Sequence, residues 1–236
     1  MLQYQRPPIE LGIYHDAEGA VIPYGHRWGG VPAGQGLELS SAPRDVYSVV
    51  THPERFEPVV TVAEALIDYL GKAYDVEIRE GLDLLPQLFP RWADMSGDEA
   101  TPDRPRPVRV VQVVPRSDAS LPLAFLFTSV PGVSLRAGFF SETVFPDCGC
   151  DACDDDVLEV CTMLEQAVFA AISGGLTESI DWRRVTEEWT FPDGGRSSGH
   201  LARDLDPRAR TAYKAFRKRH RGGPQPWAAR LTEETR

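Results

Sequence analysis

The run Leu121-Pro-Leu-Ala-Phe-Leu-Phe-Thr-Ser-Val-Pro-Gly-Val-Ser-Leu-Arg-Ala-Gly-Phe-Phe140 decides the fold class of this chain. Its two halves, 121–130 and 133–140, are rich in the β-branched and aromatic residues that favour strands. Pro131-Gly132 separates them, and a short turn between two strands predicts an antiparallel hairpin. The segment 108–114 has the same composition and predicts a further strand.

Two segments with helical periodicity flank these strands. Beyond Val59, apolar residues recur at helical spacing and form one stripe: Val62, Ala63, Leu66, Ile67 and Leu70. Thr51 and Glu54 have the spacing of a capping box, and Pro58 predicts a kink or a restart of this helix. A second apolar-faced helix is predicted over about 155–173, where Gly174 ends it.

These elements predict an α+β fold. With a half-buried strand at 74–78, we expect a two-layer sandwich: an antiparallel sheet of about four strands with two main helices on one face. Asp206-Pro207 predicts the start of a basic C-terminal helix that ends near His220.

The expected organisation has three parts. Residues 1–45, rich in Gly and Pro, form an irregular segment that packs on the core, with a hairpin around 16–19. Residues 46–192 form the α+β core domain with the cysteine loop, and 193–236 form a linker and the basic helix. Within these parts, the composition of 95–107 and 194–199 predicts loops.

Charge and hydropathy restrict the class of protein. The 236 residues carry a net charge of −10, yet 203–236 carry +6, so the remainder carries −16. Such an acidic body disfavours nucleic acid, while the basic helix could contact an acidic protein partner or fold back on the body. No apolar run reaches the ~18–20 residues that span a bilayer, and no secretory signal is present, so we expect a cytoplasmic protein without a membrane partner.

The segment Cys148-Gly-Cys150-Asp-Ala-Cys153 carries the most specific chemistry. In the reducing cytoplasm, clustered thiols indicate metal ligands or redox groups before structural disulfides. Cys148, Cys150 and Cys153 can surround one tetrahedral zinc ion, and Gly149 permits the tight backbone between the first two. Cys153 is expected close to a helix N-terminus, where the helix dipole favours a thiolate.

The fourth ligand is left open by the sequence. Cys161 lies on the apolar stripe of the second helix, about 12 Å along it from Cys153, and is therefore assigned to the core. The remaining candidates are Asp151, Asp154, His52, His200 or a water molecule. A metal-free acidic turn and a redox-active cysteine pair are the alternatives to a zinc site.

Two stretches carry a resemblance to a known family: 47–56, Tyr-Ser-Val-Val-Thr-His-Pro-Glu-Arg-Phe, and 145–154, Phe-Pro-Asp-Cys-Gly-Cys-Asp-Ala-Cys-Asp. They resemble an uncharacterised actinobacterial family, a domain of unknown function with an FPxCGCDACD motif, over about residues 20–190. The resemblance implies that Cys148, Cys150 and Cys153 belong to the family's pattern, and it implies no activity.

The resulting hypothesis is a non-enzymatic cytoplasmic domain of unknown function whose cysteine loop binds a structural zinc, and which acts as an interaction module. The alternative is an enzyme that uses the same cysteines, either a zinc-dependent hydrolase or a thiol redox protein. The coordination distinguishes them, because structural zinc has four protein ligands and catalytic zinc keeps one open position.

Overall fold

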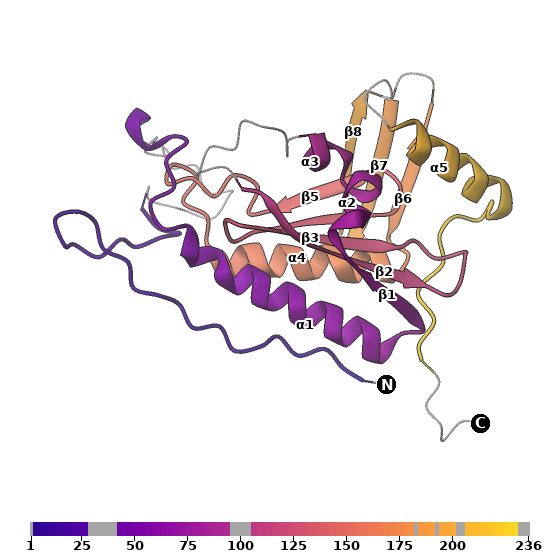
Figure 1. Cartoon of the computed structure of the whole chain (residues 1–236), viewed down its shortest axis with the longest axis horizontal. Helices are drawn as coiled ribbons and strands as arrows, with labels where there is room; N and C mark the ends of the chain where they lie inside the picture. The colour runs from indigo at the N-terminus through magenta and orange to yellow at the C-terminus, as the bar shows by residue number, and fades with distance from the viewer. Residues whose placement is uncertain are drawn as a thin grey trace.

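The structure is a computed structural model of the chain. It describes residues 2–27, 42–94, 105–181, 184–191, 194–201 and 206–230, with the backbone alone for 196–198, 200 and 201. Most of the loop predicted at 95–107 therefore lies outside the described residues. Helices and antiparallel strands combine as an α+β fold, which confirms the predicted fold class (Figure 1).

A five-stranded sheet forms the centre of the molecule. Its order is β1-β2-β3-β4-β5, so each strand pairs antiparallel with its neighbour in the chain. The strands are β1 (Val76–Glu80), β2 (Pro107–Pro115), β3 (Leu123–Thr128), β4 (Val133–Ala137) and β5 (Ser141–Phe145). The hairpin predicted at Pro131-Gly132 is confirmed, since Phe127 of β3 lies opposite Val133 of β4.

Two long helices, α1 (Glu57–Ala73) and α4 (Val157–Ile172), cover one face of this sheet, as predicted (Figure 1). The apolar stripe of α1 and one set of alternate strand residues share a single core. Its fully buried side chains include Leu66, Leu70, Phe125, Leu135 and Leu164. Burying a side chain of this size contributes about 1.5–3 kcal/mol to stability, so this core holds the two layers together.

Short helices cover part of the opposite face. α2 (Leu85–Leu88) and α3 (Pro90–Asp94) pack there, and Phe89 between them is completely buried against Val110 and Leu126. Leu126 of β3 belongs to this second cluster, whereas its neighbour Phe125 belongs to the core under α1 and α4, so the two side chains face opposite sides of the sheet. A strand buried on both sides has a nearly continuous apolar sequence, as β3 does, whereas a half-exposed strand alternates.

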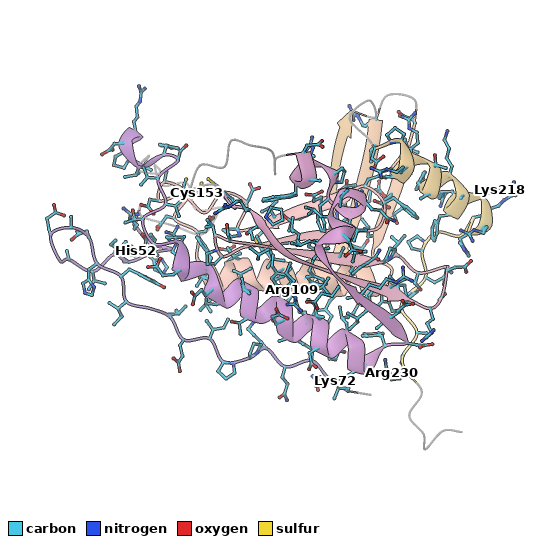
Figure 2. The ribbon with its side chains drawn as sticks, viewed as in Figure 1. His52, Lys72, Arg109, Cys153, Lys218 and Arg230 are labelled. Carbon is cyan, nitrogen blue, oxygen red and sulfur yellow. The ribbon has the colours of Figure 1, made fainter. Side chains whose placement is uncertain are left out.

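A second sheet and the C-terminal helix pack at one end of the molecule. β6 (Leu176–Ile180), β7 (Arg184–Phe191) and β8 (Gly194–Leu201) pair antiparallel in that order. α5 (Pro207–Arg219) follows, and the Asp206 carboxylate accepts from the Arg208 N–H, which confirms the predicted cap. Tyr213 and Phe216 are buried, whereas basic residues such as Lys218 remain exposed (Figure 2). The helix thus folds back on the body.

The N-terminal segment extends along α1 (Figure 1). Tyr4 donates a hydrogen bond to Glu165 on α4, and Arg6 forms an ion pair with the same carboxylate. Of the hairpin predicted around 16–19, the structure has the turn and one isolated antiparallel bridge, between His15 and Val21.

Several local predictions were wrong. The glycine-rich segment 194–199, predicted as a loop, belongs to β8, because pairing with β7 satisfies its backbone. β5 was missed, since it is short and mixed in polarity, and so was β6. Thr51 caps no helix: a 3-10 turn (Pro53–Phe56) precedes α1, and the Thr51 hydroxyl donates to Asp151 instead. The restart at Pro58 is confirmed, because α1 begins at Glu57.

Within the described part of the chain, no helix combines the length and apolar character needed to cross a bilayer.

Candidate metal centre

The cysteine loop connects β5 to α4. Gly149 adopts a φ of +71°, a conformation that residues with a Cβ rarely adopt, and so the chain turns sharply between Cys148 and Cys150 as predicted. The N–H groups of Cys153 and Asp154 donate to the Cys150 carbonyl at 3.2 and 3.3 Å. These two bonds fold the Cys150–Cys153 segment into a tight turn that returns the third thiol toward the first two.

The three sulfur atoms converge. The Sγ atoms of Cys148, Cys150 and Cys153 all lie within 4.8 Å of one another, and those of Cys150 and Cys153 are 3.4 Å apart. Sulfurs bound to one zinc at ~2.3 Å are separated by less than ~4.6 Å, so small side-chain movements suffice for all three to bind one ion. The trio is therefore positioned to hold a metal ion.

The pKa values of Cys150 and Cys153 are shifted in opposite directions. Burial raises the pKa of Cys150, but hydrogen bonds from the Cys148 thiol and from the Cys153 and Ser48 backbone outweigh it and lower that pKa to about 7. Burial and hydrogen bonding with Cys150 and Cys148 raise the pKa of Cys153 to about 12. The expected effect of a helix dipole on Cys153 is thus wrong. α4 begins only at Val157, and the Asp156 carboxylate caps its N–H groups.

Asp151, a candidate fourth ligand, is used elsewhere. Asp151 is 3% exposed, and its carboxylate accepts from Arg55 Nη1 at 3.2 Å, from the Tyr24 hydroxyl at 3.3 Å and from the Thr51 hydroxyl. Burial raises its pKa, yet the hydrogen bonds from Thr51 and Arg55 outweigh burial, so the pKa of Asp151 is lowered. The carboxylate therefore faces Arg55 as an anion rather than the sulfurs.

Asp154 and His52 are also engaged. The Asp154 carboxylate accepts from the backbone N–H groups of Gly25 at 3.0 Å and Arg27 at 2.6 Å. His52 Nδ1 lies 2.9 Å from Glu54, and its Nε2 lies 3.2 Å from the His15 carbonyl oxygen. None of these side chains joins the three cysteines among the grouped ligand atoms of the described residues.

His200 and Cys161 are set apart by their position. The side chain of His200 lies outside what the structure describes, but its backbone pairs with Val185. Val185 packs in one cluster with Phe140, the residue directly before β5. The cysteines follow the opposite end of β5, and Cys153 lies far from β8 in the same view (Figures 1 and 2). Cys161 is fully buried in the core, as predicted.

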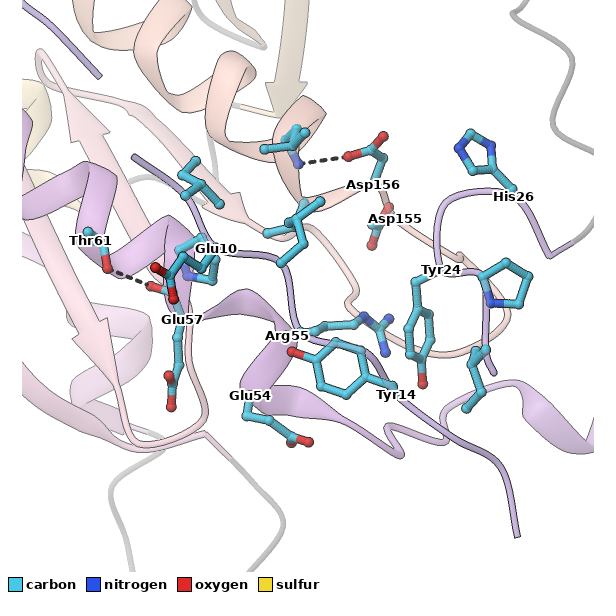
Figure 3. Close-up of a pocket in the computed structure, with 18 of the residues that line it drawn as sticks. Glu10, Tyr14, Tyr24, His26, Glu54, Arg55, Glu57, Thr61, Asp155 and Asp156 are labelled. Carbon is cyan, nitrogen blue, oxygen red and sulfur yellow. Dashed lines mark hydrogen bonds between the residues drawn. The ribbon is translucent and has the colours of Figure 1, made fainter. Parts of the chain in front are cut away.

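Arg55 is the residue that the sequence analysis missed. It is 3% exposed, stacks over the Tyr24 ring at 3.9 Å and donates from Nη2 to the Gly149 carbonyl at 3.1 Å. Figure 3 shows its guanidinium between Tyr14 and Tyr24. It lies in the 47–56 stretch that carries the family resemblance, but nothing local distinguishes it from an exposed arginine.

Cavities of contrasting character open at the two ends of the loop. One of about 840 Å³ is lined by Tyr14, Tyr24, Arg55 and five carboxylates (Figure 3). These acidic residues are Glu10, Glu54, Glu57, Asp155 and Asp156. The other, a groove of about 860 Å³, includes Cys148 in its wall and is lined mainly by apolar side chains: Val49, Val50, Phe56, Trp92, Val130, Pro131, Val144 and Phe145.

The comparisons with known proteins identify a family without supplying an activity. No curated protein and no solved structure matches the chain. Residues 12–231 match the family described as "Family of unknown function (DUF6226)". Because this match covers nearly the whole sequence, the chain belongs to the DUF6226 family of unknown function.

Proposed function

We propose that this protein binds one zinc ion through Cys148, Cys150 and Cys153, and that the ion fixes the β5–α4 loop in place. The observation that carries the proposal is the convergence of three sulfurs, each within 4.8 Å of the others, from cysteines that lie within one six-residue segment. Neighbouring free thiols gain only weak S–H···S hydrogen bonds from such proximity, whereas thiolates that share a divalent cation gain several kcal/mol of binding energy.

The donor set favours zinc over harder cations. Thiolates are soft ligands that magnesium and calcium do not select, whereas zinc accepts them readily in a tetrahedral arrangement. Zinc is also redox-inert, so it protects thiolates instead of exchanging electrons with them. We further propose a cytoplasmic, non-enzymatic protein, since that compartment keeps the three thiols reduced.

The position of the loop supports a structural contribution. Between Phe145 and Val157 the chain forms no regular element, yet it links the last strand of the central sheet to α4. Buried contacts from Asp151 and Asp154 already hold this loop against the N-terminal segment and Arg55. A bound ion would add a crosslink between Cys148 and Cys153, on the side where both residues are exposed.

Metal analysis of the purified full-length protein tests the proposal. We expect about one zinc per chain, and we expect Cys150→Ser to lose the metal and to melt at a lower temperature. Cys161→Ser is the matched control, because it also removes a thiol but lies in the core; it should keep the metal. Protein that takes up no zinc, and whose Cys150→Ser variant is as stable as wild type, would refute the zinc site.

A second function is favoured by one specific observation. Structural zinc sites usually have four protein ligands, but none of the described His, Cys, Asp or Glu side chains completes this set. An open fourth position is typical of zinc that binds a substrate, which supports an enzyme that uses the same cysteines: a zinc-dependent hydrolase or a thiol redox protein. Counting sulfur and oxygen ligands of the zinc-loaded protein by X-ray absorption would separate a closed site from an open one.

A further inference from the structure

We propose that the fourth coordination position of this zinc binds the sulfur of a thiol whose apolar, uncharged body lies in the groove beside Cys148. This inference rests on the proposed zinc site and names the class of ligand that the site accepts.

In the part of the chain that the structure describes, no His, Cys, Asp or Glu side chain joins the three cysteines to close the site. The sequence contains four cysteines and five histidines, and the undescribed segments 28–41 and 95–104 contain none of them. Cys161 is in the core, both nitrogens of His52 are engaged, and the backbone of His200 lies in the second sheet. Among the described residues, the fourth position of a cation held by Cys148, Cys150 and Cys153 is therefore open to a ligand from outside the chain.

The donor preference of zinc favours a thiol over water, because zinc readily accepts a fourth soft thiolate in a tetrahedral arrangement, whereas a bound water molecule stays neutral here and is easily displaced. Three thiolates around a divalent cation leave a net charge of −1, which weakens the cation's ability to withdraw charge from a bound water molecule. Water, with a pKa near ~15.7, needs strong polarisation before it ionises at neutral pH. A free thiol has a pKa near ~8.5, and a thiol that coordinates a metal ion is deprotonated outright.

The groove selects the rest of the ligand. Its walls include Val49 and Val50, which are 43% and 42% exposed, together with Trp92 and Pro131. Among the residues that line it, Asp147 is the one charged side chain. The groove therefore offers apolar contact and no cationic partner for a carboxylate or a phosphate. The acidic cavity at the other end of the loop includes none of the three cysteines.

The binding step is a ligand exchange that needs no oxidant. The incoming thiol R–SH forms a zinc–sulfur bond, the zinc–water bond breaks, and the thiol proton passes to solvent. The products are the zinc-bound thiolate, one released water and one released proton. The oxidation states of zinc and sulfur stay the same throughout.

Cobalt provides a spectroscopic test. The full-length protein loaded with Co²⁺ is titrated with 2-phenylethanethiol, and with 2-phenylethanol as the oxygen-containing control. We expect the thiol to increase the sulfur-to-cobalt charge-transfer absorption and the alcohol to leave it unchanged. In the zinc-loaded protein, calorimetry in buffers of different ionisation enthalpy should show release of about one proton per thiol bound.

Paired variants test the groove. Val50→Asn should weaken thiol binding about tenfold, because it replaces an apolar contact with a polar one, and should leave metal content unchanged. Ile13→Asn is the matched control: Ile13 is 74% exposed and lines neither cavity, so binding should match wild type.

The outcomes separate the two proposals. Metal-loaded protein that shows no spectral change with 2-phenylethanethiol, or the same change with 2-phenylethanol, overturns the thiol inference and leaves the zinc site intact. Equal weakening by Val50→Asn and Ile13→Asn overturns the role of the groove. Protein that takes up neither cobalt nor zinc removes both the inference and the function on which it rests.

Discussion

The Arg55 guanidinium lies 3.2 Å from the Asp151 carboxylate, and the two side chains are only 3% and 4% exposed. Arg55 belongs to the turn that precedes α1, whereas Asp151 stands between two of the candidate metal ligands. The ion pair therefore joins the turn that leads into the first helix to the cysteine loop, across a separation of 96 residues. Tyr24 and Thr51 complete the arrangement by donating to the same carboxylate.

Asp151→Ala is expected to destabilise the protein by about 3–5 kcal/mol, because it leaves the buried Arg55 charge without its partner. Asp68→Ala is the control, since its pair with Lys72 is exposed and contributes at most ~0.5 kcal/mol. Urea denaturation of both variants measures the difference. Equal losses would contradict a special role for the buried pair.

The stability of the protein should depend on Glu178. This buried β6 carboxylate accepts hydrogen bonds from the backbone N–H groups of Phe139, Phe140 and Ser141, and so ties the second sheet to the β4–β5 turn. Burial is the main reason that the pKa of Glu178 is raised from 4.5 to about 7. The nearby Glu187 carboxylate adds to the increase, and the three N–H donors partly oppose it.

The sign of the pH dependence follows from this raised pKa. The folded state retains the Glu178 proton where the unfolded state has released it, so this contribution is complete below pH ~4.5 and decreases as the pH rises to ~7. A pKa difference of this size corresponds to roughly 3 kcal/mol. Glu178→Gln should remove that part of the dependence, as urea denaturation at pH 5 and pH 8 would measure. An unchanged pH profile in the variant would show that Glu178 does not titrate in this range.

Zinc affinity should increase as the pH rises. In the metal-free trio, the raised pKa of Cys153, about 12, means that zinc must displace a proton from this thiol. Competition with a chromophoric chelator at pH 6.5, 7.5 and 8.5 would measure the trend. A pH-independent affinity would show that the cysteines are not the ligands.

Asp206→Ala should destabilise α5 and cost about 1 kcal/mol, because the Asp206 carboxylate accepts from the Arg208 N–H at 2.8 Å and caps the helix. Asp206→Ser retains a capping oxygen and should restore most of the loss. Thermal unfolding of the three proteins makes the comparison, and an identical melting temperature for Ala and wild type would contradict the cap.

The main helices and the β3–β4 hairpin could be predicted from short stretches of sequence. Helical periodicity predicted α1 and α4, and the residues around Pro131-Gly132 predicted the β3–β4 hairpin, because side-chain period and turn chemistry act over a few residues. β8 was missed for the opposite reason. Its glycines have little strand preference of their own, and pairing with β7 supplies the hydrogen bonds that make it a strand.

The sequence by itself determined the α+β class, the two main helices and the spacing that brings Cys148, Cys150 and Cys153 together, since those thiols lie on one short turn. Only the tertiary structure decided how Asp151, Asp154, Thr51 and His52 are used. The two carboxylates and the imidazole could bind a metal ion, and all four side chains could form hydrogen bonds with other residues. Which of these each side chain does depends on the residues that folding places beside it, and most of those residues are distant in the sequence. For Asp151 that residue is Arg55, and it holds the carboxylate away from the candidate metal site.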